Sequence, residues 1–155
     1  MLSESSRADI RRIRKEYPDT QSALLPALYR AQEDYGGWLP EGAFEEVAAE
    51  MDVPPALVAS VASFYTMLNR RQVGRHLIQI CTNITCTLLG SERLVEHSGS
   101  KLHIKPGETT ADRKFTLLEV ACLGTSGTAP MMQVDDKYHE SLTQDRVDEI
   151  LASLD

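Results

Sequence analysis

The chain has 155 residues, of which 42% are hydrophobic and 25% are charged, a composition that indicates a folded globular protein. Its formal net charge of -7 argues against a nucleic-acid partner, because phosphate binding requires clustered Lys and Arg. No apolar run approaches the roughly 18 residues of a membrane span, and the first six residues have no apolar secretory core. We therefore expect a cytoplasmic protein with no direct membrane insertion.

The first half of the sequence predicts four short helices that form a small bundle over residues 1–70. The second helix has Ser22 as its candidate cap, Pro26 in its first turn and Gly36-Gly37 at its end. Pro54-Pro55 opens the fourth helix. The apolar positions at helical spacing are Ile10, Ile13, Tyr17, Leu24, Leu25, Leu28, Tyr29, Phe44, Val47, Ala48, Met51, Leu57, Val58 and Val61.

Two charged clusters fall within these helices. Glu41, Glu45, Glu46 and Glu50 recur in the third helix, and Arg or Lys occupies every position of residues 11–15 except Ile13. We interpret both clusters as solvated faces, with docking of an acidic neighbour as the alternative for the basic run.

Beyond residue 71 the apolar spacing changes from the period of a helix to that of a strand. The expected order is strand, helix, strand, strand, helix, which suits a thioredoxin-like α/β layer over residues 74–155 and makes the whole chain α+β. In chain order, the expected features are a strand from His76 to Ile80, a helix from Cys86 to Ser98-Gly99, a loop from Ile104 to Arg113, strands from Phe115 to Val120 and from Met131 to Val134, a turn at Asp135-Asp136, and a last helix capped by Thr143.

The cysteines lie where these strands end. Cys81 and Cys86 are five positions apart after the first strand, and Cys122 follows the second. Two strands of one sheet would bring both loops to the same edge, so the thiols would converge as a binuclear iron–sulfur cluster requires. Gly124 and Gly127 would let backbone approach the sulfides without a side chain in the way. For any single cysteine here, burial as a small apolar residue is the commoner fate.

The motif Cys81-x4-Cys86, followed by Cys122-Leu123-Gly124-x-Ser126-x-x-Ala129-Pro130, resembles the signature of the thioredoxin-like ferredoxin or "24 kDa" family. This family comprises the small [2Fe-2S] subunits of NADH dehydrogenases. The resemblance covers the chain from about Tyr17 to its end. It extends to three further stretches, Gly36-Gly37-Trp38-Leu39, Val61-Ala62-Ser63-Phe64-Tyr65 and Lys105-Pro106-Gly107-Glu108-Thr109-Thr110.

The resemblance implies a non-catalytic electron carrier within NADH:quinone oxidoreductase (respiratory complex I). Its [2Fe-2S] cluster would be held by Cys81, Cys86, Cys122 and Ser126. A larger flavoprotein subunit would hold FMN and NADH, and the complex would be peripheral to the inner membrane. Alternatives are the equivalent subunit of an NAD-linked hydrogenase or of a formate dehydrogenase. This chain has no Gly-x-Gly-x-x-Gly run of its own for NADH.

Ser126 departs from the family pattern, which has a fourth cysteine at that position. A serine must lose a proton of much higher pKa before it can bind iron as an alkoxide. Ser126 therefore ligates iron, or water or another side chain takes its place, or the cluster is absent and the chain is a structural or assembly subunit.

Three other functions fit the sequence less well. A Cys3His zinc site could use His76, His97, His103 or His139, but none of them is at finger-like spacing from a cysteine. A thioredoxin-type thiol oxidoreductase would need Cys-x-x-Cys, which the chain lacks. A helix-turn-helix DNA binder is opposed by the net charge.

Overall fold

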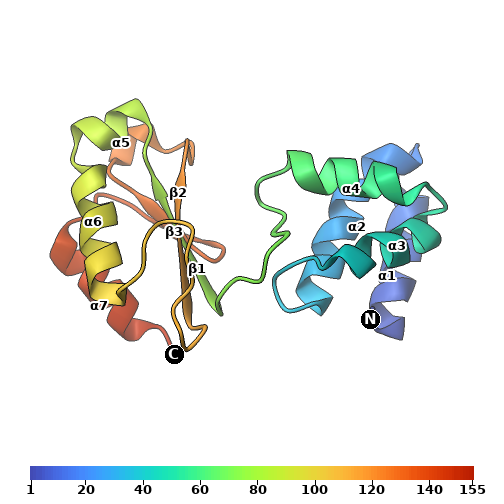
Figure 1. The fold of residues 1–155 in the computed structure, drawn as a ribbon. Helices are drawn as coiled ribbons and strands as arrows, with labels where there is room; N and C mark the ends of the chain where they lie inside the picture. Colours follow the sequence, from blue (N-terminus) through green and yellow to red (C-terminus); the bar gives the residue numbers. More distant parts are fainter. The chain divides into compact units, whose positions relative to one another are not determined.

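The structure, a computed structural model, describes all 155 residues. The chain divides into two compact units, Met1–Gln72 and Val73–Asp155. The first unit contains four helices and the second a four-stranded mixed sheet with helices (Figure 1). The expected α+β class, with helices preceding a thioredoxin-like sheet, is confirmed.

The helical unit consists of α1 (Glu4–Glu16), α2 (Thr20–Asp34), α3 (Glu41–Met51) and α4 (Pro55–Phe64). Its core contains Leu39, from the segment between α2 and α3, and apolar residues at helical spacing, among them Ile10, Ala23, Leu24, Ala27, Leu28, Ala43, Val47, Met51, Val58 and Ala62.

The start of α2 differs from the prediction. Asp19, not Ser22, caps this helix, and its carboxylate accepts the amide of Ser22 at 2.8 Å. Because α2 therefore begins at Thr20, Pro26 lies in the second turn and not in the first. The helix ends at the expected glycines, with Gly36 in the left-handed region at φ 76°.

The sequence suggested that both charged clusters of the helical unit are solvated faces. The structure shows instead that residues of the two clusters contact each other. The guanidinium of Arg7 contacts Glu46 and Glu50 at 2.8 Å each, and Arg11 contacts Glu50 at 2.6 Å. Hydrogen bonds from Arg11 and Arg7 hold the pKa of Glu50 below its usual value. The acidic neighbour of the basic run is thus α3 of the same chain, while Glu41 and Glu45 remain exposed.

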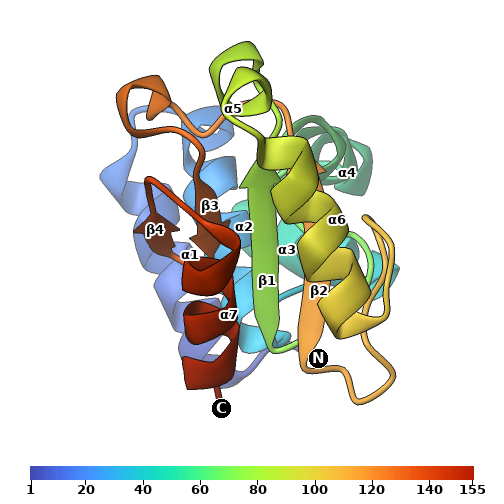
Figure 2. The same cartoon turned by 90° about the vertical axis from the view of Figure 1, so that its left-hand side faces the viewer.

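The sheet of the second unit has the strand order β2-β1-β3-β4. Strands β1 (His76–Cys81) and β2 (Phe115–Val120) are parallel, and β1 pairs antiparallel with β3 (Met132–Val134), which pairs with β4 (Lys137–His139). Helices α6 (Ser91–Leu102) and α7 (Gln144–Ser153) lie on one face of this sheet (Figure 2). The core between these helices and the strands contains Ile78, Ile80, Leu94, Val95, Leu117, Met132, Val134, Val147, Ile150 and Leu151.

One helix of this unit was predicted with wrong bounds. A short helix, α5 (Ile84–Leu88), starts before Cys86, and after Gly90 the separate helix α6 continues past Gly99 to Leu102. A Cβ atom on Gly99 would lie 2.8 Å from the carbonyl oxygen of Ile104. Gly99 therefore allows the chain after α6 to pack closely, and it does not end the helix.

The last helix, α7, begins as predicted. The hydroxyl of Thr143 accepts the amide of Arg146 at 3.2 Å. No single helix of the chain has the length and apolar content to cross a bilayer. The pair α3 and α4 reaches that length and composition together, but the two helices meet at a bend of 119°.

Candidate metal centre

Two loops leave the sheet side by side at the carboxyl ends of β1 and β2. Cys81 is the last residue of β1 and lies opposite Val120, the last residue of β2. The first cysteine loop, residues 81–86, is joined to the second, residues 121–130. The amide of Thr82 donates to the carbonyl of Val120 at 2.9 Å, and the side-chain amide of Asn83 donates to the carbonyl of Ala121 at 3.0 Å. The two strands were expected to lie in one sheet and to bring the loops together, and they pair directly, in parallel.

The structure brings the three cysteine thiols together. Cys81 and Cys86 are buried and Cys122 is exposed, and none of them forms a disulfide. The thiols of Cys86 and Cys122 lie near enough to that of Cys81 to lower its pKa. Met131, which is fully buried, packs against Cys81 and Cys86, and Leu123 and Ala129 cover the same cluster.

Backbone amides determine which of these thiols ionises first. Burial raises the pKa of the Cys81 thiol, but hydrogen bonds from the Asn83 and Leu123 amides and from the other two thiols outweigh it, so the pKa falls below its ordinary value. Burial and the proximity of Cys81 raise the pKa of Cys86, despite a bond from the Met131 amide. Of the two thiols, Cys81 therefore ionises more readily than Cys86.

Cys122 is held by the turn that follows it. The amide of Gly124 donates to the sulfur of Cys122 at 3.3 Å. Gly124 lies in the left-handed region at φ 82°, and a Cβ there would meet no atom within 4 Å. The glycine is thus required by the backbone conformation and not by lack of space in the protein.

Ser126, the fourth candidate ligand, lies at the start of the short 3-10 turn η1 (Ser126–Thr128). Its side chain is exposed, and no hydrogen bond joins its hydroxyl to the thiols or to nearby backbone. Ser126 therefore lies in the same loop as Cys122, and its hydroxyl makes no hydrogen bond to the rest of the protein.

The amide donors of Asn83, Leu123, Gly124 and Met131 were not found from the sequence. Every residue except proline has such a donor, so no side-chain signal marks these four. Of the two amides that reach Cys81, one belongs to Asn83, the residue that precedes α5, and the other to Leu123 of the second cysteine loop.

The histidines that the sequence offered as zinc ligands do not join the cysteine site. His76 contacts Asp135 at 2.8 Å, and His97 contacts Asp148 at 2.7 Å. No group of three or more His, Cys, Asp or Glu side chains is arranged to hold a single metal ion. A binuclear cluster differs, because it spreads its ligands over two irons.

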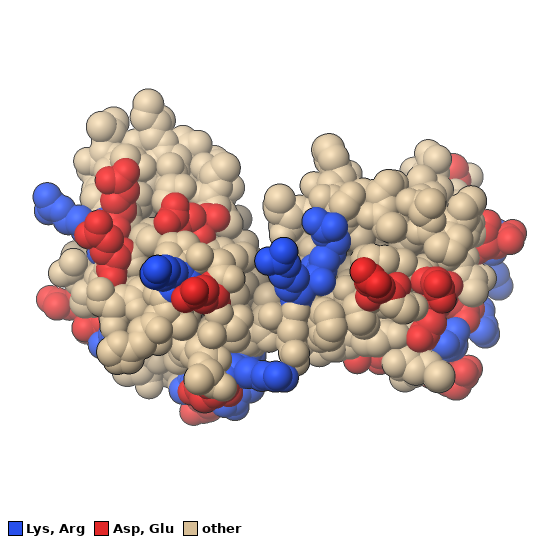
Figure 3. Space-filling model, viewed as in Figure 1, with Lys and Arg blue, Asp and Glu red and all other residues tan.

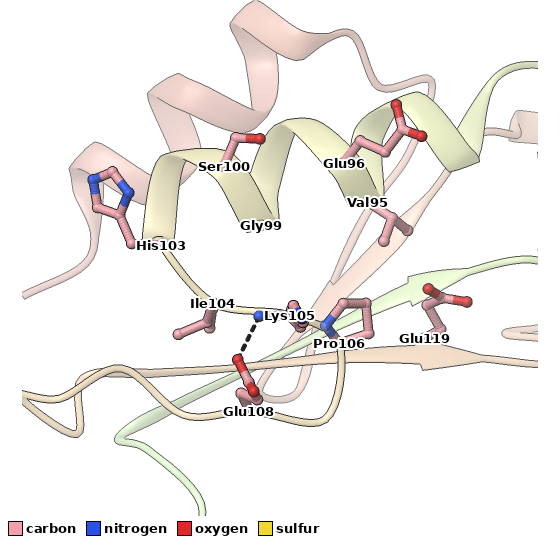
Figure 4. Close-up of a pocket in the computed structure, with 10 residues that line it drawn as sticks. All are labelled: Val95, Glu96, Gly99, Ser100, His103, Ile104, Lys105, Pro106, Glu108 and Glu119. Atoms are coloured by element: carbon pink, nitrogen blue, oxygen red, sulfur yellow. Dashed lines mark hydrogen bonds between the residues drawn. The ribbon is translucent and has the colours of Figure 1, made fainter.

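A cavity of about 550 Å³ also lies outside the cysteine loops. It opens between α6 and residues 104–108, with Glu119 of β2 at its edge, and it is lined by no cysteine (Figure 4). Within its lining, the backbone amide of Lys105 donates a hydrogen bond to the carboxylate of Glu108 at 2.8 Å, which Figure 4 shows as a dashed line.

The segments that form the cysteine loops contain no charged residue. No Asp, Glu, Lys or Arg occurs between Arg75 and Glu92 or between Glu119 and Asp135. In Figure 3 the end of this unit that bears α5 is correspondingly free of coloured side chains. Helix α5 instead exposes Ile84 and Leu88, which are 73% and 79% accessible.

Comparison with known proteins identifies the class of protein that this fold and site define. A sequence profile of the thioredoxin-like [2Fe-2S] ferredoxins matches residues 10–155. The chain belongs to this family, and the resemblance found in the cysteine motif is confirmed.

Named relatives are similar over most of the chain. An NADH-quinone oxidoreductase subunit of Rickettsia conorii is 45% identical over 142 residues, which are 90% of this chain and 85% of the relative. Its counterpart in Rhizobium meliloti, also named as a subunit of NADH-quinone oxidoreductase, is 44% identical over 95% of this chain and 87% of its own length. The mitochondrial NADH dehydrogenase [ubiquinone] flavoprotein 2 of Dictyostelium discoideum is 42% identical over 92% of this chain and 58% of its own length.

A solved structure shares the fold. The crystal structure of an air-oxidized NAD+-reducing [NiFe]-hydrogenase superposes with a TM-score of 0.73 at 27% identity over 83% of this chain. The match spans 22% of the hydrogenase chain, so it concerns a part of that protein.

The residues present fit a [2Fe-2S] cluster. Iron–sulfur clusters are held by deprotonated thiols, and three thiols converge here with backbone amides directed at their sulfurs. These amides favour a negatively charged sulfur-rich group for the same reason that they lower the pKa of Cys81. The donor set therefore matches the cofactor that the family implies.

Proposed function

We propose that this chain is the electron-transfer subunit of an NADH:quinone oxidoreductase, and that Cys81, Cys86, Cys122 and Ser126 hold its [2Fe-2S] cluster. The observation that carries the proposal is the grouping of three thiols on two adjacent loops, with backbone amides directed at their sulfurs. The curated relatives support the parent complex, because they are named as subunits of NADH-quinone oxidoreductase.

In this proposal Cys81 and Cys86 bind one iron, and Cys122 and Ser126 bind the other. The bound cluster would supply one-electron acceptance and donation. The protein positions the ligands through the pairing of β1 with β2. The amides of Asn83, Leu123 and Gly124 stabilise negative charge on the sulfurs, and Met131 excludes water from Cys81 and Cys86.

The partner that we propose is the larger flavoprotein subunit, which would bind FMN and NADH. The absence of charged residues from the cysteine loops supports docking there, because the exposed Ile84 and Leu88 would lose water contact against an apolar partner surface. A second contact would use the helical unit, where Phe64 is 78% accessible and stacks edge-on against Tyr65. The assembled complex would lie at the cytoplasmic side of the inner membrane.

A cluster-free assembly role fits the site less well. Such a subunit would need neither the three thiols nor the amides that lower the pKa of Cys81. The NAD+-reducing hydrogenase is the other parent complex that the fold allows, but its identity to this chain is 27%, whereas the NADH-quinone oxidoreductase subunits reach 45%.

The test is anaerobic co-expression of the full chain with its flavoprotein partner, followed by iron and acid-labile sulfide analysis and electron paramagnetic resonance. We expect two irons and two sulfides per chain and a signal from one electron in the reduced state. A chain that co-purifies with the flavoprotein but contains no sulfide would contradict the electron-carrying role. A chain that elutes alone would contradict the proposed partner.

A further inference from the structure

The second cysteine loop contains a hydroxyl group that the protein leaves without a partner. Thr125 Oγ1 is buried and makes no hydrogen bond, and the two other groups of this kind, on Ser91 and Ser98, lie on α6. Burial of an unpaired hydroxyl costs free energy, so such a group calls for an explanation.

The Thr125 hydroxyl does not make the capping hydrogen bond that is usual at its position. Thr125 occupies the N-cap position of η1, where a threonine hydroxyl ordinarily accepts a backbone amide, yet no side-chain cap bond is formed. Its backbone is held in place all the same, because its carbonyl accepts the amide of Thr128 at 3.1 Å and the Thr128 hydroxyl at 3.3 Å. The side chain is therefore on a fixed backbone and has a free donor.

The position of Thr125 suggests what the missing partner is. It directly precedes Ser126 and follows Cys122 by three residues, so it stands between two of the proposed ligands. Leu123 and Ala129, on either side of it in the loop, pack against Cys81, Cys86 and Met131. A bound cluster would bring sulfide and thiolate acceptors to this loop, and a hydroxyl can donate to sulfur.

We propose that Thr125 is a positioning residue that donates a hydrogen bond from Oγ1 to a sulfur atom of the bound [2Fe-2S] centre. This inference rests on the proposed function. A donor to sulfur stabilises the reduced state, which carries one more negative charge, and so raises the reduction potential. The hydroxyl also contributes to retention of the cluster.

The test compares Thr125→Val with Thr125→Ser in the full chain co-expressed with its flavoprotein partner. Valine keeps the shape of threonine and removes the donor, whereas serine keeps the donor. In redox-titrated electron paramagnetic resonance, Thr125→Val should lower the ratio of reduced to oxidised cluster about tenfold at a fixed potential, which corresponds to about 59 mV for one electron. Thr125→Ser should stay close to the unsubstituted chain. Thr125→Ser is therefore the matched control for Thr125→Val.

A second measurement separates this role from a structural one. In the cluster-free chain the hydroxyl has no partner, so Thr125→Val should unfold in urea at the same concentration as the unsubstituted chain or a higher one. A destabilised cluster-free Thr125→Val would overturn the proposal, and so would an unchanged potential and cluster lifetime. Failure of Thr125→Val alone to retain the cluster would support it, and equal failure of Thr125→Ser would overturn it.

The two levels of the proposal fail in different ways. If the unsubstituted chain contains no iron and sulfide, the proposed function is wrong. If it carries a cluster that Thr125→Val leaves unchanged, only the role of Thr125 is wrong.

Discussion

Substitution of Gly124 tests whether backbone conformation holds the second cysteine loop. Gly124 has φ 82°, in the left-handed region, and its amide is the donor to the sulfur of Cys122. A side chain there would meet no protein atom within 4 Å, so Gly124→Ala adds conformational strain without a clash. Left-handed backbone costs an L-residue about 1–2 kcal/mol, and we expect Gly124→Ala to lower the free energy of unfolding by that amount.

Gly127 is the matched control, three residues further along the same loop. It has no left-handed backbone, and a Cβ there would also meet nothing within 4 Å. Gly127→Ala should therefore leave stability within about 0.5 kcal/mol or raise it slightly, because alanine restricts the unfolded chain. The two variants differ in backbone conformation and share the loop and the chemical change.

The assay is urea unfolding of the cluster-free chains, followed by the rate at which a chelator removes iron from the loaded ones. A strain of about 1–2 kcal/mol corresponds to about a 5- to 30-fold rise in the fraction of molecules whose loop is open. Gly124→Ala should therefore lose iron faster by a similar factor. Equal behaviour of the two variants would refute the conformational reasoning. Damage from Gly127→Ala only in the loaded chain would instead show that backbone at Gly127 approaches the cluster closely.

Three further substitutions test other parts of the structure. Gly99→Ala should destabilise the second unit by about 1–3 kcal/mol in thermal or urea unfolding, because its Cβ would meet the Ile104 carbonyl at 2.8 Å; Ser100→Ala, exposed on the same helix, should not. The pKa of Glu50 is lowered in the folded state. Its contribution to stability is therefore present above the pKa of the unfolded state and is lost as the pH falls through the pKa of the folded state. Glu50→Gln should flatten this dependence of stability on acid pH, whereas Glu45→Gln, at an exposed position, should not. Leu88→Glu should weaken co-purification with the flavoprotein but leave iron content unchanged, whereas Tyr138→Glu, on the exposed β4, should change neither co-purification nor iron content.

The parts of the fold that could be predicted are those with local signals. The second strand runs from Phe115 to Val120 as predicted, because a short apolar run there is bounded by turn residues and followed by a cysteine. The capping role of Thr143 was likewise found, since a hydroxyl that accepts the helical amide three residues further on is a local pattern. Such features depend on residues close together in the sequence.

The features that were missed depend on contacts between distant residues. Glu46 and Glu50 have the spacing of a solvated helix face, but their arginine partners stand on α1, about 40 residues away in the sequence. Gly99 has the usual signature of a helix end, and only the approach of Ile104 shows why it is glycine. In the candidate site, the cysteines were identified from their spacing, whereas the amides around them carry no sequence signal.

The exposed Ser126 hydroxyl makes the fourth ligand position open to a direct test. Because no hydrogen bond to the protein occupies this hydroxyl, binding of iron by Ser126 would break no existing bond. Oxygen is a harder donor than sulfur and favours the ferric state. If Ser126 ligates iron, the cluster should have a lower reduction potential than in the Ser126→Cys variant and should be lost more easily to chelators or air.

Redox-titrated electron paramagnetic resonance of the native chain and of Ser126→Cys decides among the three outcomes that the serine allows. A lower potential and a shorter cluster lifetime in the serine chain would indicate an alkoxide ligand. The same potential and lifetime in both chains would remove Ser126 from the coordination sphere and leave water or another side chain at the second iron. A signal found only in Ser126→Cys would mean that the serine chain keeps the fold and the thiols but has lost its electron-carrying role, and it would contradict the proposed function directly.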